Sequence, residues 1–387
     1  MNTNKTNDIN SKLPNVGVSI FSEMSGLANQ YKAINLSQGF PEFDTPEFIK
    51  NKINYYISAG LNQYAPSSGL PKLQSAIADL VNTKYNANID SANHVTVTSG
   101  ATEALFVAIQ TLVKSGDEVI VFDPAYDSYE PAIELAGGKA IHLQLKAPTY
   151  RVNWDDVIGA ITPNTKAIIV NTPHNPTGTI LTESDINNLS KIITDHKLYL
   201  ISDEVYEHIV FDEQTHFSAL RFEQLRKRAF VISSFGKTFH CTGWKLGYCI
   251  APTNLTEEFR KIHQYVTFSS FTPAQAAIAD MLTENSTHVY ALSDFYQQKR
   301  NVLINALQDS RFKLLPCNGT YFLLLNYSAI SDVKDVEFCH WLTKEHGVAA
   351  IPLSVFNQSG HCDKIIRLCF AKNDNTLINA AERLCQL

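Results

Sequence analysis

Six short apolar runs between about residues 94 and 252 limit what this chain can fold into. Each has the four to six apolar or β-branched residues of a strand buried on both faces. Helical periodicity fills the intervals, and the interval 182–196 opens with Thr-x-x-Asp, an approximate capping box. Buried strands that alternate with helices predict an α/β fold with a mainly parallel sheet sandwiched by helices. The runs are 94-HVTVTS-99, 118-EVIVFD-123, 166-KAIIVN-171, 198-LYLISDE-204, 229-AFVISSF-235 and 246-LGYCIAP-252.

The pattern changes after about Thr272, where long helical stretches give way to a second set of short strands and helices. This predicts a smaller α+β domain that follows the large one. We expect four parts: a disordered polar tail at 1–12, an N-terminal segment at 13–45 that packs on the small domain, a large domain at 46–280 and a small C-terminal domain at 281–387.

Charge and composition exclude several classes of protein. The 32 basic and 38 acidic residues give a formal charge of −6, which argues against a nucleic-acid partner. No run of 18 apolar residues predicts a membrane helix, and the polar first residues do not resemble a signal peptide. The seven cysteines are scattered without a C-x-x-C pair or zinc-ligand spacing, so we expect reduced thiols, no metal and a cytoplasmic location.

Five of the apolar runs end in residues suited to chemistry. In an open α/β sheet the carboxyl ends of parallel strands meet at one edge, where ligands bind. The small residues of 99-SGATEA-104 open a helix, whose backbone N–H groups and dipole favour a phosphate. The five segments are 99-SGATEA-104, 123-DPAYDSY-129, 171-NTPHNPTG-178, 202-SDEVY-206 and 234-SFGKTFHCTGWK-245.

Three charged residues at or near these ends each allow two interpretations. Asp203 follows an apolar strand, and it either caps the next helix or holds a cationic ring nitrogen. Arg367 lies within the apolar 365-IIRLCF-370, where it either forms an internal salt bridge or binds a ligand carboxylate. Lys237 is either a solvated loop residue or an amine that forms imines with aldehydes.

Taken together, the motifs resemble the class I/II aminotransferases, which are pyridoxal-phosphate enzymes of fold type I. The likeness runs in order from about Leu13 to Leu387. Within the family, the chain is most similar to the kynurenine/glutamine transaminase branch, and 351-IPLSVF-356 extends the likeness to its bacterial methionine aminotransferases. The motifs are 35-NLSQGFPEF-43, 63-QYAPSSGLPKL-73, 98-TSGATEAL-105, 171-NTPHNPTG-178, 202-SDEVYEHIVF-211, 233-SSFGKTFHCTGWKLGY-248 and 366-IRLCF-370.

The resemblance implies a pyridoxal 5′-phosphate cofactor joined to Lys237 as a Schiff base, with Lys237 also moving the substrate proton. Asp203 matches the partner of the ring nitrogen, and Tyr126 matches the aromatic residue that stacks on the ring. Asn175 and Tyr206 match the residues that bind its phenolic oxygen. The phosphate positions are Ala101, Thr102, Ser234 and Lys245, with Tyr64 from a second subunit, which implies a homodimer with shared active sites.

The resemblance also implies where the substrate binds. Arg367 matches the residue that holds the α-carboxylate, helped by Asn175 and the backbone of Gly39. Phe21, Phe356 and, from the other subunit, Phe268 match the side-chain pocket, although core packing is the alternative for each. An aromatic, uncharged pocket favours methionine or aromatic amino acids, since sulfur packs well against rings.

One position departs from many members of the family. Lys245 stands where they have arginine, and a lysine binds phosphate less directionally. The kynurenine/methionine branch resembles this chain in having lysine here, so the departure supports that branch.

The implied activity is transfer of the amino group of an uncharged hydrophobic or aromatic L-amino acid to a 2-oxo acid by a ping-pong mechanism. Methionine is the expected preferred donor. The alternatives are a cysteine-conjugate β-lyase and a mainly kynurenine- or glutamine-directed transaminase. An aminotransferase-like regulator of transcription needs a basic helix-turn-helix extension, which the dozen polar residues before Leu13 do not resemble.

Overall fold

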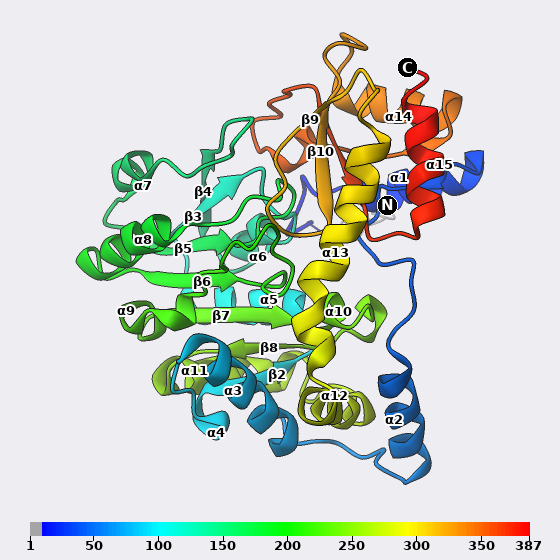
Figure 1. The fold of residues 1–387 in the computed structure, drawn as a ribbon. Helices are drawn as coiled ribbons and strands as arrows, with labels where there is room; N and C mark the ends of the chain where they lie inside the picture. The colour runs from blue at the N-terminus through cyan, green and yellow to red at the C-terminus, as the bar shows by residue number, and fades with distance from the viewer. Residues whose placement is uncertain (1–9) are drawn as a thin grey trace, which may run out of the picture.

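A seven-stranded sheet forms the centre of residues 10–387, the part of the chain that this computed structural model describes (Figure 1). Strand β8 runs antiparallel to both of its neighbours, and the other neighbouring pairs are parallel. The order across the sheet is β2 (Val95–Thr98), β8 (Gly247–Ile250), β7 (Ala229–Ser234), β6 (Tyr199–Asp203), β5 (Thr165–Asn171), β3 (Glu118–Asp123) and β4 (Lys139–Gln144). The predicted α/β fold with a mainly parallel sheet is confirmed.

Successive residues along the strands alternate between two cores, as a pleated sheet requires. Ile169 belongs to the core beneath α5 (Ala101–Leu112), α6 (Tyr129–Leu135) and α11 (Thr253–Val266). Its neighbours Ile168 and Val170 belong to the core shared with α3 (Pro71–Tyr85), α8 (Glu183–Asp195) and α12 (Thr272–Glu284). The sheet is therefore apolar on both faces and covered by helices on both, which explains the continuous apolar runs in the sequence.

Helix α8 begins where its sequence predicts. The Thr182 side chain accepts a hydrogen bond from the backbone N–H of Asp185 at 3.2 Å, and the Asp185 carboxylate accepts one from the N–H of Thr182 at 2.8 Å. These reciprocal bonds form a capping box that satisfies two free donors at the helix end.

A smaller four-stranded sheet lies beside the large one, in the order β12 (Ile351–Pro352), β13 (Ile365–Cys369), β10 (Phe322–Asn326) and β9 (Lys313–Leu314), all antiparallel. Strand β1 (Ile34–Asn35) pairs with β11 (Val348–Ala349), which brings the N-terminal segment against the C-terminal part of the chain. The remaining helices are α1 (Ile20–Tyr31), α2 (Glu47–Ser58), α4 (Ser91–His94), α7 (Trp154–Ala160), α9 (Glu223–Arg226), α10 (Phe235–Thr238), α13 (Thr287–Ala306), α14 (Asp335–Glu345) and α15 (Asp374–Leu384).

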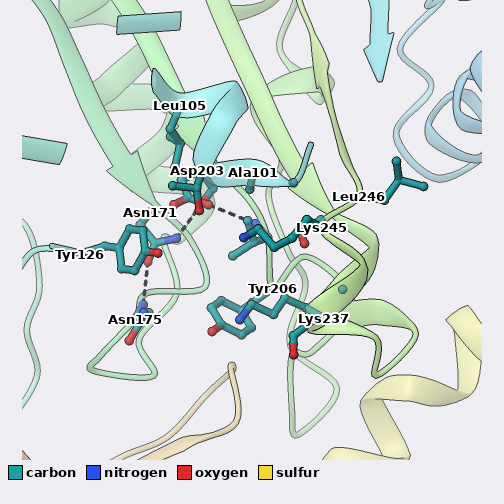
Figure 2. A pocket seen from close by; sticks show the side chains of 16 residues that line it. Ala101, Leu105, Tyr126, Asn171, Asn175, Asp203, Tyr206, Lys237, Lys245 and Leu246 are labelled. Carbon is teal, nitrogen blue, oxygen red and sulfur yellow. Dashed lines mark hydrogen bonds between the residues drawn. The ribbon is translucent and has the colours of Figure 1, made fainter. Parts of the chain in front are cut away.

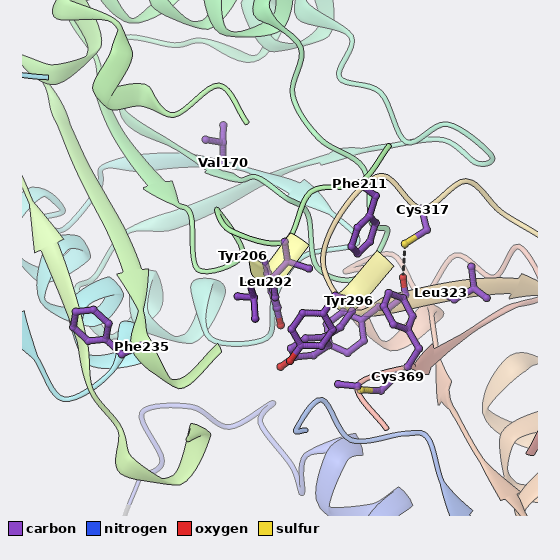
Figure 3. Close-up of a cluster of buried hydrophobic side chains, with 14 of the residues drawn as sticks. Val170, Tyr206, Phe211, Phe235, Leu292, Tyr296, Cys317, Leu323 and Cys369 are labelled. Atoms are coloured by element: carbon purple, nitrogen blue, oxygen red, sulfur yellow. Dashed lines mark hydrogen bonds between the residues drawn. The ribbon is translucent and has the colours of Figure 1, made fainter. Parts of the chain in front are cut away.

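The two sheets share one continuous core. Tyr206 from the chain after β6, Leu292 and Tyr296 from α13, Leu323 from β10 and Cys369 from β13 all belong to it (Figure 3). In Figure 1 the yellow helix α13 runs from the large sheet up along the small one. A division at 45/46 and 280/281 into N-terminal segment, large domain and small domain remains our proposal; most of the expected tail, residues 1–9, lies outside the described residues.

None of the helices formed by residues 10–387 combines the length and the apolar character that a membrane span requires.

Candidate active site

A pocket opens at the carboxyl ends of the parallel strands, and its space, part of which is open to solvent, is about 680 Å³. Ligands of open α/β sheets bind at this edge. All of the sequence-predicted cofactor residues except Tyr64 line it, and Figure 2 shows their side chains around the space. The lining residues are Gly100, Ala101, Thr102, Leu105, Tyr126, Asn171, Asn175, Asp203, Val205, Tyr206, Ser234, Gly236, Lys237, Thr242, Lys245 and Leu246.

Lys237 lies in the short helix α10, which starts directly after β7. Its Nζ donates a hydrogen bond to the hydroxyl of Tyr321 at 3.0 Å. Burial, with the nearby charges of Lys245 and Arg367, lowers the pKa of Lys237 to about 8. A substantial neutral fraction near physiological pH lets this amine act as a nucleophile or a base, so the interpretation as a solvated loop residue is wrong.

Asp203 ends strand β6 and is 3% exposed. The hydroxyl of Tyr129 donates to its Oδ2 at 2.6 Å. Burial raises the pKa of Asp203 to about 6, although this hydrogen bond pulls in the opposite direction. The chain after Asp203 forms turns, so the interpretation as a helix cap is wrong. A buried carboxylate facing a pocket is stabilised by a cationic ligand.

The other end of the pocket is built for an anion. Helix α5 begins at Ala101, directly after Gly100, whose φ of +81° favours glycine. A Cβ on Gly100 would lie 3.5 Å from Nζ of Lys245, so this lysine lies against the helix N-terminus. A Cβ on Gly236 would lie 3.0 Å from the Thr242 backbone, so a larger residue at this position would crowd the pocket lining. Free N–H groups, a helix dipole and an ammonium fit a phosphate group.

Asn171 connects Asp203 and Asn175, which line the pocket from two different segments. Its side-chain nitrogen donates to the backbone oxygen of Asp203 at 2.9 Å, and its side-chain oxygen accepts from the N–H of Asn175 at 2.7 Å. Both bonds are dashed in Figure 2. The pairing of β5 with β6 places Asn171 opposite Asp203, so strand register fixes this connection.

Arg367 occupies the middle of β13 and is 1% exposed. It donates to the Asn175 side-chain oxygen at 2.8 Å and to the Ser37 carbonyl at 3.1 Å, while its Nε has no hydrogen-bond partner. Among residues 10–387 it forms no ion pair, so the predicted alternative of an internal salt bridge is wrong. A buried guanidinium without a counter-ion favours an anionic ligand.

Three aromatic rings surround this guanidinium. Its central carbon lies 3.9 Å from the ring centroid of Phe322, 5.3 Å from that of Phe21 and 5.5 Å from that of Phe356. Phe21 and Phe356 also contact each other, with centroids 5.8 Å apart. The space beside Arg367 is therefore aromatic on this side, and the charged groups near the guanidinium include Asp127 and Lys237.

Of the predicted substrate-binding residues, Asn175 alone lines this pocket. Two predicted residues are exposed on the surface of this chain. Tyr64 is 82% exposed and Phe268 is 48% exposed, and their rings meet edge to face at 5.2 Å on the surface of this chain. Gly39 contributes its carbonyl, which accepts the hydroxyl of Tyr321 at 2.7 Å.

Four residues that contact predicted site residues were not themselves predicted from the sequence, namely Tyr129, Asn171, Tyr321 and Phe322. Asn171 and Tyr129 stand within the quoted strand-end segments 171-NTPHNPTG-178 and 123-DPAYDSY-129, which is a usable signal. Tyr321 and Phe322 belong to an apolar run typical of a core, where a tyrosine that packs and one that directs its hydroxyl at a lysine look alike in sequence.

The donor set fits pyridoxal phosphate, the cofactor that the resemblance implies. A carboxylate at one end, an anion cradle at the other and a low-pKa lysine between them match its cationic ring nitrogen, its phosphate and its aldehyde.

Comparisons with known proteins agree with the resemblance. The model of the family described as aminotransferase class I and II matches residues 31–384. The chain is 54% identical over 377 residues to the methionine aminotransferase of Escherichia coli, covering 97% of this chain and 98% of that protein. It is 33% identical to the kynurenine–oxoglutarate transaminase of Dictyostelium discoideum, covering 96% and 94%.

A solved structure agrees in detail. The crystal structure of YbdL from Escherichia coli, for which a methionine aminotransferase function was identified, superposes with a TM-score of 0.97 at 54% identity. The match covers 98% of this chain and 100% of that one.

Proposed function

The chain belongs to the class I and II aminotransferases, which use pyridoxal phosphate, and we propose that it takes the amino group of an uncharged, apolar L-amino acid, methionine first, and passes it to a 2-oxo acid. The observation that carries this proposal is Arg367. Its buried guanidinium, free of ion pairs within residues 10–387, lies near Lys237 and suits the α-carboxylate of an amino acid.

Methionine is supported by two independent arguments. A relative that matches almost the whole chain carries methionine in its name. The rings of Phe21, Phe322 and Phe356 beside Arg367 offer the aromatic contacts that a thioether favours, and they offer no cation for a second carboxylate.

We assign the cofactor to the pocket of Lys237. The Asp203 carboxylate would hold the ring nitrogen in its protonated form, and Tyr126 would stack on the ring. Asn175 and Tyr206 would bind its phenolic oxygen, and Ala101, Thr102, Ser234 and Lys245 its phosphate. When bound, the cofactor supplies an electron-withdrawing ring and a reactive aldehyde carbon.

We assign the proton transfer at the substrate Cα to Nζ of Lys237. The lowered pKa of about 8 leaves a fraction of this amine unprotonated near neutral pH, and that fraction can accept a proton. Because α10 holds the lysine inside the pocket, the transfer is effectively intramolecular, which accounts for a large part of the rate in such reactions.

Substrate orientation follows from Arg367 and Asn175. The guanidinium would pair with the α-carboxylate, and Asn175, bonded to Arg367 at 2.8 Å, keeps the fork directed. The backbone of Gly39 lies on the same segment as Ser37, which also binds Arg367. The side chain of the substrate would then extend toward Phe21 and Phe356, with Phe268 added by a second subunit.

A homodimer with shared active sites is supported by the exposed aromatic residues Tyr64, Tyr265, Phe268 and Phe271. The rings of Tyr64 and Phe268 contact each other, and exposed apolar side chains that lie together favour a protein partner. Tyr64 and Phe268 would then complete the phosphate site and the side-chain pocket of the neighbouring copy. A cytoplasmic location is supported by the seven free cysteines, which suit a reducing compartment.

The experiment is a half-reaction survey on the cofactor-loaded protein. Each amino acid is mixed in turn, without an oxo acid, and the visible absorbance of the cofactor is followed. Methionine and the aromatic amino acids should react faster than aspartate and glutamate, and Lys237→Ala should show neither reaction nor the lysine-bound absorbance. Rapid reaction of aspartate with none from methionine contradicts the proposed specificity.

The two alternatives from the sequence are not favoured by the comparisons. A β-lyase is distinguished from a transaminase by measuring the release of pyruvate and ammonia from a cysteine S-conjugate, with and without a 2-oxo acid. A kynurenine- or glutamine-directed enzyme would show the larger kcat/KM for those donors.

A further inference from the structure

The amino group of Lys237 and a carbonyl of the N-terminal segment meet at one buried hydroxyl. The Oη of Tyr321 lies 3.0 Å from Nζ of Lys237 and 2.7 Å from the backbone oxygen of Gly39. Lys237 follows a strand of the large sheet, Tyr321 precedes β10 of the small sheet, and Gly39 belongs to the N-terminal segment. One hydroxyl therefore joins three separate parts of the chain.

The direction of these hydrogen bonds follows from counting protons. Burial raises the pKa of Tyr321 well above its ordinary value, so the phenol stays neutral and carries one proton. A carbonyl can only accept, so this proton goes to Gly39. The remaining contact must run from an N–H of Lys237 to a lone pair of Tyr321.

We propose that Tyr321 is a positioning residue for Lys237, which fixes the amino group and raises its affinity for a proton by accepting its hydrogen bond. This inference rests on the role of Lys237 in the proposed function. An acceptor favours the ammonium over the neutral amine, because only the charged form gains a strong, charge-assisted bond.

Packing alone does not explain this hydroxyl. The ring of Tyr321 is held by Tyr206 at 5.1 Å, Phe322 at 4.8 Å and Tyr296 at 5.6 Å between centroids, so a phenylalanine would keep the same place. Tyr206 and Tyr296 are labelled in Figure 3. Burying a hydroxyl is unfavourable unless it is bonded, and here both partners belong to the site.

The N-terminal segment also connects this hydroxyl to Arg367. Ser37 accepts from Arg367 at 3.1 Å, two residues before Gly39 accepts from Tyr321. A Cβ on Gly39 would lie 2.7 Å from Phe322, so only glycine permits this approach. One short segment thus sets the place of the carboxylate-binding group and, through Tyr321, of the proton-transferring amine.

Several other groups act on the pKa of Lys237. Asp203 and Cys369 raise it, and Lys245 and Arg367 lower it, while burial is the largest cause. The rings of Tyr206 and Tyr321 each lie 5.6 Å from Nζ. Replacing Tyr321 by phenylalanine leaves all of these in place and removes the hydroxyl that accepts from Lys237 and donates to Gly39.

The test compares Tyr321→Phe with the wild type in the full-length protein. In the cofactor-free form, the pKa of Lys237 is measured from the pH dependence of its labelling by fluorodinitrobenzene, read by mass spectrometry of its peptide. We expect this pKa to fall by about one pH unit. In the loaded enzyme, kcat should fall about tenfold and its pH optimum should move downward, while KM for methionine stays unchanged because Arg367 is intact.

Tyr327→Phe is the matched control. Tyr327 is also fully buried and donates to a backbone carbonyl, that of Val333, at 2.8 Å, but it stacks on Phe338, whereas the Tyr321 hydroxyl accepts from Lys237. Its variant loses a comparable hydrogen bond, and we expect the pKa of Lys237 and the pH profile to match the wild type.

An unchanged Lys237 pKa and pH profile in Tyr321→Phe overturns the inference, while transamination by the wild type leaves the proposed function standing. A wild type that does not transaminate contradicts the proposed function, whereas the labelling experiment still reports whether Tyr321 acts on Lys237. An equal pKa change in Tyr327→Phe would also overturn the inference, since it would reflect general loosening of the core.

Discussion

The Tyr129 hydroxyl donates a 2.6 Å hydrogen bond to the Asp203 carboxylate at the base of the pocket. Both residues are buried, and the pKa of Tyr129 is well above its ordinary value, so the phenol remains a donor. This bond favours the ionised form of Asp203 against burial, which raises the pKa of Asp203 to about 6. A carboxylate buried in this way lowers the stability of the cofactor-free protein and is useful only for binding a cationic ligand.

The first prediction concerns that cost. The pKa of Asp203 in the folded protein, about 6, lies above the ordinary 3.8. The stability that the protonated Asp203 contributes is therefore fully present below pH 3.8 and is lost as pH rises through 6. This lowers the free energy of unfolding by about 3 kcal/mol. In urea unfolding of the cofactor-free protein, Asp203→Asn should therefore gain stability relative to the wild type between pH 4 and 7, while binding the cofactor more weakly. An equal pH dependence in both proteins would contradict the prediction.

The second prediction uses two buried arginines with opposite surroundings. Arg300 pairs with both oxygens of Asp212 at 2.6 and 2.7 Å, whereas Arg367 has no carboxylate partner within residues 10–387. Arg367→Lys should raise KM for methionine and lower kcat/KM about 100-fold, because a lysine cannot form the planar fork. Arg300→Lys should lower the free energy of unfolding by about 1–3 kcal/mol and leave KM unchanged. Steady-state kinetics and urea unfolding of both variants check this.

The sequence predicts strands well where both faces are buried. Strand β4 escaped prediction because it is the half-exposed edge of the sheet, and Lys139, His142 and Gln144 interrupt its apolar pattern. The antiparallel direction of β8 also could not be predicted from the sequence, because the apolar periodicity is the same for either strand direction.

The site was predictable where a charge interrupts an apolar run, because burying a charge demands a reason. Asp203 and Arg367 were found in this way. Tyr129 and Tyr321 were not found in this way, because tyrosines commonly pack in cores and only the structure shows where their hydroxyls point. The roles of Tyr64 and Phe268 depend on a second subunit and remain proposals.

The third prediction concerns the side-chain pocket. Phe356 contacts Phe21 and lies 5.5 Å from the guanidinium of Arg367. Phe356→Leu should lower kcat/KM for methionine and phenylalanine about tenfold, since the larger donors lose ring contacts, and should change kcat/KM for alanine little. Phe338→Leu, in a buried stack with Tyr327, is the control that affects stability alone. Equal losses for alanine and methionine would assign Phe356 to general packing.

The fourth prediction concerns Glu207, which holds the turn that carries Tyr206. Its carboxylate accepts hydrogen bonds from Tyr85 and, at 2.8 Å, from Tyr248. Burial alone would raise the pKa of Glu207, but its neighbours His208 and Lys84 and the Tyr85 hydroxyl outweigh burial and lower it to about 2. A lowered pKa contributes stability above the ordinary 4.5 that is lost as pH falls toward 2, here about 3 kcal/mol.

Glu207→Gln should therefore unfold more easily than the wild type at pH 7 by about 2–3 kcal/mol, and the difference should shrink between pH 4.5 and 2. Because Tyr206 lies one residue away and lines the pocket, cofactor affinity should fall as well. Glu223→Gln, which removes an exposed pair with Lys227, is the control and should leave the stability close to that of the wild type. Urea unfolding across this pH range measures both. If the two variants lose the same small amount of stability, the buried carboxylate does not hold the turn.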